Sequence, residues 1–188
     1  MPTRLDPEPL TDSLGCGRLV GVQTPLTTRE LDKKSVVSVS DGLKVGTVKD
    51  LLIDTTTLAA TDLLVSGDSG LGRVPIETIK EIGQDAIMIE SSQEVLWATS
   101  KASFPGRRAK ELLGLPVLDS KGNVVGTLHD LDLIDFRIVA LCVHSGGVLG
   151  IGATNKQIPA TEIRGIGPKL ITVELFEVPV LEVDVPES

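Results

Sequence analysis

The stretch Gly146-Gly147-Val148-Leu149-Gly150-Ile151-Gly152, which runs on to Ile158-Pro159, decides the fold of this chain. Four glycines in seven residues leave few side chains to pack, so the backbone here must bend tightly or approach another strand closely. A phosphate-binding loop is the functional alternative, but no Lys-Ser or Lys-Thr pair follows, no amphipathic helix opens after the glycines, and their spacing is not that of a dinucleotide site. The stretch is therefore interpreted as architecture.

An internal repeat supports this interpretation. The run Gly42-Leu43-Lys44-Val45-Gly46-Thr47-Val48-Lys49-Asp50-Leu51 returns as Gly122-Asn123-Val124-Val125-Gly126-Thr127-Leu128-His129-Asp130-Leu131. The run from Val74-Pro75 to Gly83 returns from Ile158-Pro159 to Gly167, and a related loop, Ser66 to Gly72, stands at the point of the first copy that matches the opening stretch. The register differs by four residues between these blocks, which predicts a four-residue insertion in the second glycine-rich loop. A feature that recurs with a repeat favours architecture over chemistry.

The shared positions are accordingly expected to have structural roles. In the first copy they are Gly42, Gly46, Thr47, Asp50, Pro75 and Gly83; in the second they are Gly122, Gly126, Thr127, Asp130, Pro159 and Gly167, together with Gly146, Gly147, Gly150 and Gly152.

The repeat divides the 188 residues into two small units. We expect a flexible lead-in over 1–26, a first repeat over 27–92, a linker over 93–106, a second repeat over 107–178 and an acidic tail over 179–188. Units of this size lie near the lower limit for an independent hydrophobic core, so the two are expected to lean on each other.

Composition excludes several classes of function. A formal net charge of -8 and an aromatic content of one Trp, three Phe and no Tyr argue against direct nucleic-acid binding. Two cysteines, Cys16 and Cys142, form neither a disulfide framework nor a zinc pattern. No apolar run approaches the ~20 residues of a membrane helix. We expect a cytoplasmic protein without cofactor, metal or membrane insertion, which could still reach a membrane through a partner.

Local patterns predict an all-β chain of two tandem small barrels with one short helical turn each. Thr27 and Glu30 form a capping box, which predicts a helical turn ending near residue 34. The first copy is expected to contain strands over 35–40, 45–54, 59–65, up to 75 and 86–90, and a short turn over 78–82, with Ile87 and Ile89 facing inward. In the second copy we expect a helix over 107–113, a strand from 117, an apolar strand over 138–144 buried on both faces, and a last strand to about 180.

These residues resemble the PRC-barrel family, the small β-barrel found in one of the subunits of photosynthetic reaction centres and at the C-terminus of a bacterial ribosome-maturation factor. Three blocks carry the resemblance over 27–92 and 107–176. They are Arg29-Glu30-Leu31 and Lys110-Glu111-Leu112 before the first strand, the Gly-x-x-Val-Gly-Thr-x-x-Asp-Leu hairpin, and the Gly-Gly-x-Leu-Gly-Ile-Gly run leading to Ile-Pro. The resemblance implies a role in assembly and docking, with no shared catalytic residue.

Few side chains suggest chemistry. His129 stands where the first copy has Lys49, so a surface strand position is favoured over a required imidazole. Cys142 and His144 alternate along one strand, but two ligands are too few for a metal site, and a buried thiol beside a strand-end histidine is the favoured interpretation.

The recurrence of Asp50 and Asp130 invites a paired-acid hypothesis. Because the two lie in separate repeats at one structural position, hydrogen bonding to a turn or to backbone is favoured over catalysis. Asp132 and Asp135 lack the spacing of a calcium loop. No catalytic triad is recognisable, so a non-enzyme is expected, with a site assembled only in the fold as the alternative.

We therefore expect a non-enzymatic adaptor or assembly protein that docks other proteins, as the resemblance implies at a membrane-associated complex of the photosynthetic type. The alternative is a ribosome-maturation-like factor that binds a ribosomal protein. Residues 31–95 hold six Lys plus Arg and eleven Asp plus Glu, a net of 6 - 11 = -5, whereas 107–178 hold eight of each. This predicts an acidic face on the first repeat, with Asp62, Asp68 and Glu77 as partner-binding residues for a basic surface, unless the acidity serves solubility alone.

Overall fold

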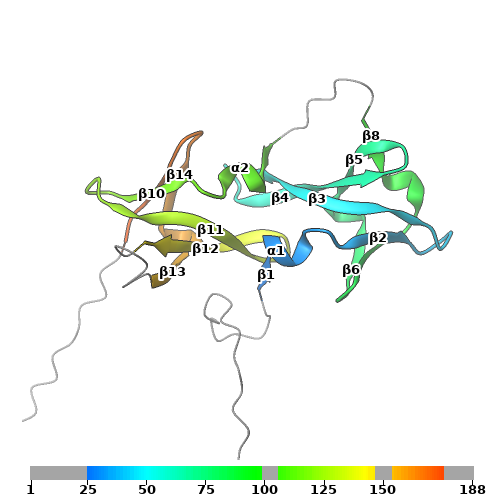
Figure 1. The fold of residues 1–188 in the computed structure, drawn as a ribbon, viewed down its shortest axis with the longest axis horizontal. Helices are drawn as coiled ribbons and strands as arrows, with labels where there is room; N and C mark the ends of the chain where they lie inside the picture. Colours follow the sequence, from blue (N-terminus) through cyan, green and yellow to red (C-terminus); the bar gives the residue numbers. More distant parts are fainter. Residues whose placement is uncertain (1–24, 99–105, 147–153, 176–188) are drawn as a thin grey trace, which may run out of the picture.

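The computed structural model describes residues 25–98, 106–146 and 154–175. Its chain is all-β apart from short helical turns, and the two repeats lie side by side in an elongated molecule. In Figure 1 the first repeat, coloured blue to green, forms the right half, and the second, green to orange, forms the left half. The short helices α1 and α2 lie near the middle, where the repeats meet.

The first repeat is built around two long antiparallel strands. Strand β3 pairs with β4 and, on its other side, with β2, which also pairs in parallel with β7. The elements are β1 (Leu26–Thr27), α1 (Thr28–Leu31), β2 (Ser35–Ser38), β3 (Lys44–Asp54), β4 (Ala59–Gly67), β5 (Gly70–Pro75), η1 (Ile76–Thr78), β6 (Ile79–Ile82), β7 (Ala86–Ile89), η2 (Ser92–Glu94) and β8 (Leu96–Trp97).

The second repeat follows the same plan. Strand β11 pairs with β12 and β10, and β10 pairs in parallel with β15. The elements are β9 (Arg107–Arg108), α2 (Ala109–Leu112), β10 (Pro116–Asp119), β11 (Val124–Ile134), β12 (Arg137–Ser145), β13 (Thr154–Pro159), η4 (Ala160–Glu162), β14 (Ile163–Ile166) and β15 (Ile171–Val173).

Gly46 and Gly126 occupy equivalent positions, and each lies close to the backbone of the neighbouring long strand, β4 or β12. A Cβ atom on Gly46 would lie 2.7 Å from the Ser66 carbonyl oxygen, and one on Gly126 would lie 2.6 Å from that of His144. Contacts this close exclude any side chain, which explains why both copies keep glycine here.

The first glycine-rich loop makes room for the single tryptophan. A Cβ atom on Gly67 would lie 2.7 Å from the Trp97 ring, and one on Gly72 would lie 2.8 Å from it. Trp97 belongs to β8, which pairs with the outer edge of β5. In this copy the glycines therefore serve packing.

Several predicted elements are confirmed. Thr27 and Glu30 form the capping box, with the Thr27 N–H donating to Glu30 Oε2 at 2.8 Å and the Glu30 N–H donating to Thr27 Oγ1 at 3.3 Å. Ile87 and Ile89 are fully buried, and β12 buries residues on both faces between 138 and 143. Strand β5 ends at Pro75 and β13 at Pro159, as expected for residues that cannot donate to a sheet.

Other expectations need correction. The segment 78–82 is not a turn, because Ile79–Ile82 forms β6 and pairs with β7, with both isoleucines half-buried against the core. Arg107–Arg108 is strand rather than helix, because it pairs with β3 of the other repeat. The strand expected over 35–40 ends at Ser38, and the helical turn expected to end near residue 34 ends at Leu31. Strand β15 ends at Val173, and residues 174–175, expected to continue a strand, are not strand.

Some expectations remain predictions. Within the segment 93–106, Leu96–Trp97 is already strand, and the division into 27–92 and 107–178 stays a prediction. The lead-in up to residue 24, Gly147, Gly150 and Gly152, and the tail from 176 onward lie outside the described residues.

The two repeats are joined by a pseudo-two-fold exchange of their leading elements. Strand β1 of the first repeat pairs with β11 of the second, and β9 of the second pairs with β3 of the first. Between them β4 meets β12, where the Ala60 N–H donates to the Phe136 carbonyl and the Ile138 N–H to the Leu58 carbonyl, both at 2.8 Å. These two bonds are images of each other, so the sheet is continuous through the junction, which we call the seam.

One hydrophobic core follows from this arrangement. Leu31 and Ile53 of the first repeat belong to the same buried cluster as Leu112 and Leu131 of the second, and all four are at most 2% exposed. The exchange therefore supplies the shared burial that such small units need.

Candidate functional site: a seam pocket and a groove on the first repeat

Asp130 fastens the first repeat's helix to the second repeat. Its carboxylate lies on β11 and is 6% exposed. Oδ1 accepts hydrogen bonds from the Thr28 N–H at 3.1 Å, from the Leu131 N–H at 2.8 Å and from the Thr28 hydroxyl. Arg29 Nε lies 3.5 Å from Oδ2. Asp130 thus satisfies backbone donors at the start of α1.

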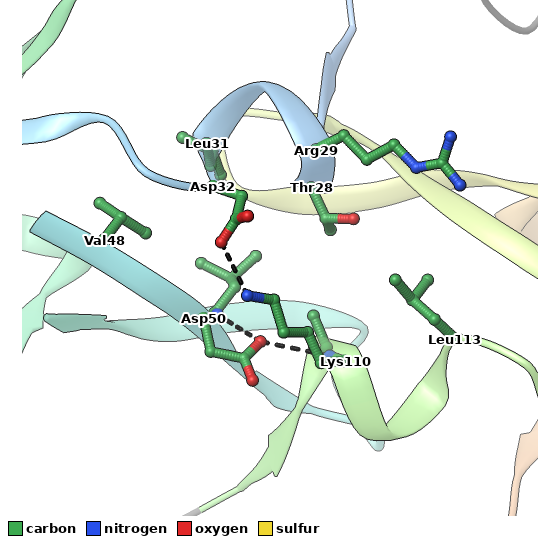
Figure 2. Close-up of a pocket in the computed structure, with 10 residues that line it drawn as sticks. Thr28, Arg29, Leu31, Asp32, Val48, Asp50, Lys110 and Leu113 are labelled. Atoms are coloured by element: carbon green, nitrogen blue, oxygen red, sulfur yellow. Dashed lines mark hydrogen bonds and ion pairs between the residues drawn. The ribbon is translucent and has the colours of Figure 1, made fainter.

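Asp50 makes the matching contact in the opposite direction. Its Oδ1 accepts hydrogen bonds from the Leu51 N–H at 2.9 Å and from the Lys110 N–H at 3.2 Å. The Lys110 ammonium donates to Asp32 Oδ1 at 2.7 Å (Figure 2). It also donates to the Lys49 carbonyl at 2.6 Å. Burial raises the pKa of Asp50 above its ordinary value, and the two N–H donors oppose that shift.

A pocket opens at the seam beside Asp50. Figure 2 shows residues of α1, β3 and α2 around it. Its volume is about 120 Å³, and it is lined by Thr28, Arg29, Leu31, Asp32, Val48, Asp50, Leu51, Ala109, Lys110 and Leu113. Small-molecule sites usually measure ~300 Å³ or more, so this pocket suits a few waters or one small apolar group rather than a substrate.

The first repeat carries a second hollow, which we call the β4–β5 groove. Its volume is about 700 Å³, and it is lined by Ala60, Thr61, Asp62, Arg73, Pro75, Ile76, Glu77 and Leu96. Asp62 is 4% exposed, and its Oδ1 lies 3.4 Å from Arg73 Nη1. Glu77 is exposed, and Leu96 is 46% exposed.

The groove changes the expected partner-binding set. Asp62 cannot belong to an open acidic face, because β5 places Arg73 beside it and the surrounding sheet buries it. Asp68, in the β4–β5 turn, and Glu77, in η1, are exposed as that set requires.

The charged groups of the groove are peculiar to the first repeat. In the β4–β5 pairing, Asp62 lies opposite Pro75, and Arg73 precedes that proline by two residues. The β12–β13 pairing contains the matching positions around Pro159. Those matching positions, with the one for Glu77, hold Ala140, Gln157 and Thr161.

Comparison with known families identifies the fold. The PRC-barrel domain matches twice, at residues 26–96 and 105–178. The chain belongs to the PRC-barrel family. Such domains generally serve protein interaction or assembly and are typically non-catalytic. No curated protein matches the chain. In the parts of this PRC-barrel protein that the structure describes, no helix is long and apolar enough to span a membrane.

The two histidines of this PRC-barrel protein lie near each other, with ring centroids 6.1 Å apart, and both are exposed whereas the Cys142 thiol is buried. His129 is exposed, and its Nδ1 lies 3.1 Å from Arg29 Nη2. His144 is also exposed, with Nδ1 2.8 Å from Asn155 Oδ1, whereas Cys142 is buried, with Sγ 3.4 Å from Asp132 Oδ1. Cys142 and His144 therefore do not form a ligand pair. Among the described residues, no three His, Cys, Asp or Glu side chains could hold a metal.

The remaining predicted motif residues lie where the barrels turn or cross. Gly42 and Gly122 stand in the hairpin turns before β3 and β11, and Gly146 follows β12. Thr47 follows Gly46 in β3, and Thr127 follows Gly126 in β11. The Gly83 N–H donates to the Ala86 carbonyl at 2.8 Å, and the Gly167 N–H to that of Leu170 at 2.9 Å.

Sequence reasoning missed the partners of the two seam aspartates. Apart from the Thr28 hydroxyl, Thr28 and Lys110 contribute backbone N–H groups, which carry no residue-specific signal, so only the recurrence of Asp50 and Asp130 pointed to this place. A second missed cluster braces the β2–β3 hairpin, where Asp41 accepts hydrogen bonds from the Ser38 hydroxyl and from the Ser92 hydroxyl at 2.6 Å.

Proposed function

We propose that this tandem PRC-barrel protein is a non-enzymatic adaptor whose first repeat docks a protein with a basic surface. The observation that carries the proposal is the β4–β5 groove, where exposed Glu77 and half-exposed Leu96 border a hollow on the repeat whose net charge is -5. The equivalent surface of the second repeat lacks these charges. Charge complementarity of this kind selects partners and speeds their association.

The seam supports an adaptor over an enzyme. The Oδ1 atoms of Asp50 and Asp130 accept hydrogen bonds from backbone N–H groups, which leaves these two repeated acids poorly placed to act on a substrate. The pocket beside Asp50 has a volume of about 120 Å³, too small to bury an ordinary substrate. Rigid fastening of two repeats suits a protein that presents surfaces to partners.

Two settings fit a basic protein partner. The first is a membrane-associated complex of the photosynthetic type, reached from the cytoplasm through the partner. The second is a ribosome-maturation complex, in which the partner is a ribosomal protein. The acidic first repeat favours a protein contact over an RNA contact in either setting, because it repels the phosphate backbone.

The test is affinity capture with the full chain, with bound proteins identified by mass spectrometry. The double variant Asp68→Asn, Glu77→Gln raises the net charge by two on the first repeat. The control Thr154→Lys, Thr161→Lys raises it equally at exposed positions of the second. We expect the first variant alone to lose the partner. Capture by the wild type should also weaken as salt rises from about 0.1 M to about 1 M, where the Debye length falls from about 10 Å to about 3 Å.

Three outcomes contradict the proposal. They are no protein enriched above the tag alone, equal losses from the two double variants, and capture that does not respond to salt.

A further inference from the structure

We propose that the β4–β5 groove is a receptor for one arginine side chain presented by the partner. The proposal rests on the proposed function only in taking the partner's surface to be basic. Three features of the groove lead to arginine: its charge, the free face of Asp62 and its apolar walls.

The charge of the groove favours a cation over an anion or a neutral group. Asp62 and Arg73 neutralise each other across β4 and β5, at an Oδ1 to Nη1 distance of 3.4 Å. Glu77, at the start of η1, is the remaining charged lining residue and is exposed. The groove therefore has a net charge of -1, and one incoming cation makes it neutral.

Asp62 offers a second, buried acceptor. Its contact with Arg73 uses only Oδ1 and is not bidentate, so Oδ2 accepts no hydrogen bond from the described residues. Among those same residues, no enclosed side-chain oxygen or nitrogen lacks a partner. Because Asp62 lines the groove, its Oδ2 is therefore not fully enclosed, although the residue is only 4% exposed.

The walls distinguish arginine from lysine. Pro75, Ile76 and Leu96 border the groove with apolar surface, and Leu96 is 46% exposed. A planar guanidinium is weakly hydrated and can lie against such surface while it donates to two carboxylates, here Asp62 and Glu77. A lysine ammonium is compact and strongly hydrated, so it gains less from these walls.

The second repeat provides a built-in control. Its equivalents of Asp62, Arg73 and Glu77 are the uncharged Ala140, Gln157 and Thr161. An arginine probe should therefore select the first repeat, although the two folds are alike.

The experiment uses no partner protein. The full chain, labelled with ¹⁵N, is titrated with N-acetyl-arginine amide, and separately with the lysine and glutamate analogues, while amide chemical shifts are recorded. We expect saturable shifts at Thr61, Ile76 and Leu96, with a dissociation constant on the order of 1 mM, and no shifts in β12 or β13. The lysine analogue should bind more weakly, and the glutamate analogue should leave these amides unmoved.

Variants test the role of each wall. Glu77→Gln should weaken binding of the arginine probe about tenfold, the usual size of one charge-assisted hydrogen bond. Leu96→Ser should weaken it less, and Glu111→Gln, an exposed change on α2, should leave it unchanged. Asp62→Asn removes a buried charge beside Arg73 and could disturb folding, so Glu77→Gln carries the decision.

The proposal is overturned if the groove amides show no saturable shift, if the glutamate analogue binds as well as the arginine probe, or if Glu77→Gln leaves binding unchanged. The adaptor proposal fails by different evidence, because it is decided by capture of a protein. Arginine binding without any captured partner would remove the adaptor role and keep the groove as a receptor. Salt-sensitive capture of a partner without binding of the arginine probe would keep the adaptor role and remove the groove as an arginine receptor.

Discussion

Asp50 and Asp130 occupy the same place in the two repeats, and of the two only Asp130 forms an ion pair with an arginine among the described residues. Arg29 is 3.5 Å from Asp130, while its counterpart Lys110 turns its ammonium to Asp32 at 2.7 Å. Burial therefore outweighs the opposing effects at Asp50 and raises its pKa.

The first prediction concerns Asp50→Asn. Because the folded-state pKa of Asp50 is raised above 3.8, the folded protein binds this proton more tightly than the unfolded chain does. The stabilisation is fully present below the unfolded pKa and is lost as pH rises through the raised folded pKa. Asn keeps an oxygen for the Leu51 and Lys110 N–H groups and has no charge to bury.

The wild type should therefore lose stability relative to Asp50→Asn as pH rises from about 3 toward 7, with the change confined to the window that begins near 3.8 and ends at the raised pKa. Urea unfolding midpoints of both proteins over this range measure the difference. A variant clearly less stable than the wild type at neutral pH would contradict the expectation.

The second prediction concerns Asp130→Ala. The change leaves the Thr28 and Leu131 N–H groups without their carboxylate acceptor at a buried position. Loss of charge-assisted hydrogen bonds of this kind should lower the free energy of unfolding by about 3 kcal/mol. Lys49→Ala is the control. Lys49 is exposed and directly precedes Asp50, the counterpart of Asp130, so this change should lower the free energy of unfolding only slightly. Denaturant unfolding measures both, and similar losses would refute the role given to Asp130.

At the scale of elements, the long strands depend on close approach of backbones. Gly46 and Gly126 pair with Val36 and Val117 on one side, and on the other side they lie against the backbone of Ser66 in β4 and of His144 in β12. A side chain at either glycine would separate strands that form the centre of each repeat.

The third prediction concerns Gly126→Ala. Its Cβ would lie 2.6 Å from the His144 carbonyl oxygen, a backbone atom that cannot turn aside as a flexible side chain would. We expect destabilisation by about 2 kcal/mol, as for other overpacked sites. Gly146→Ala is the matched control, because nothing lies within 4 Å of its Cβ position. Thermal melts of the two variants should separate them clearly, and equal melting temperatures would show the backbone contact to be unimportant.

At the scale of the whole molecule, the exchange of β1–α1 against β9–α2 joins the two repeats through one sheet and one core, so we expect them to fold as one unit. Hydrogen bonds at the seam run in both directions, and one buried cluster includes residues of both halves. Presenting two unlike surfaces on one rigid body suits an adaptor, because the charges of the first repeat then keep a defined position relative to the second.

The fourth prediction tests this unity through the single tryptophan. Trp97 lies in the first repeat, so its fluorescence reports unfolding there, while circular dichroism reports both halves. Ile171→Ala, in the buried core of the second repeat, should cost about 3 kcal/mol. If the repeats unfold together, both signals should shift to the same lower midpoint. A tryptophan transition that stays in place would show that the repeats unfold separately.

The sequence predicted the charge of part of the candidate site but not its exposure, and the partner-binding role of these residues stays a prediction. Asp62 and Glu77 were grouped by charge, and the structure brings both to one groove. Asp62 is buried where β4 pairs with β5, and its contact Arg73 lies on that next strand, eleven positions away, so no local pattern could show it.

The sequence alone determined the architecture of each repeat, because its signals are local or periodic. The Thr27 and Glu30 capping box, the apolar run of β12 and the matched blocks around Gly46 and Gly126 each predict a structure within a few residues of themselves. Only the tertiary structure decided how the repeats join. The exchange depends on backbone N–H groups of Thr28 and Lys110 meeting carboxylates 102 and 60 residues away, and every residue other than proline carries such a group.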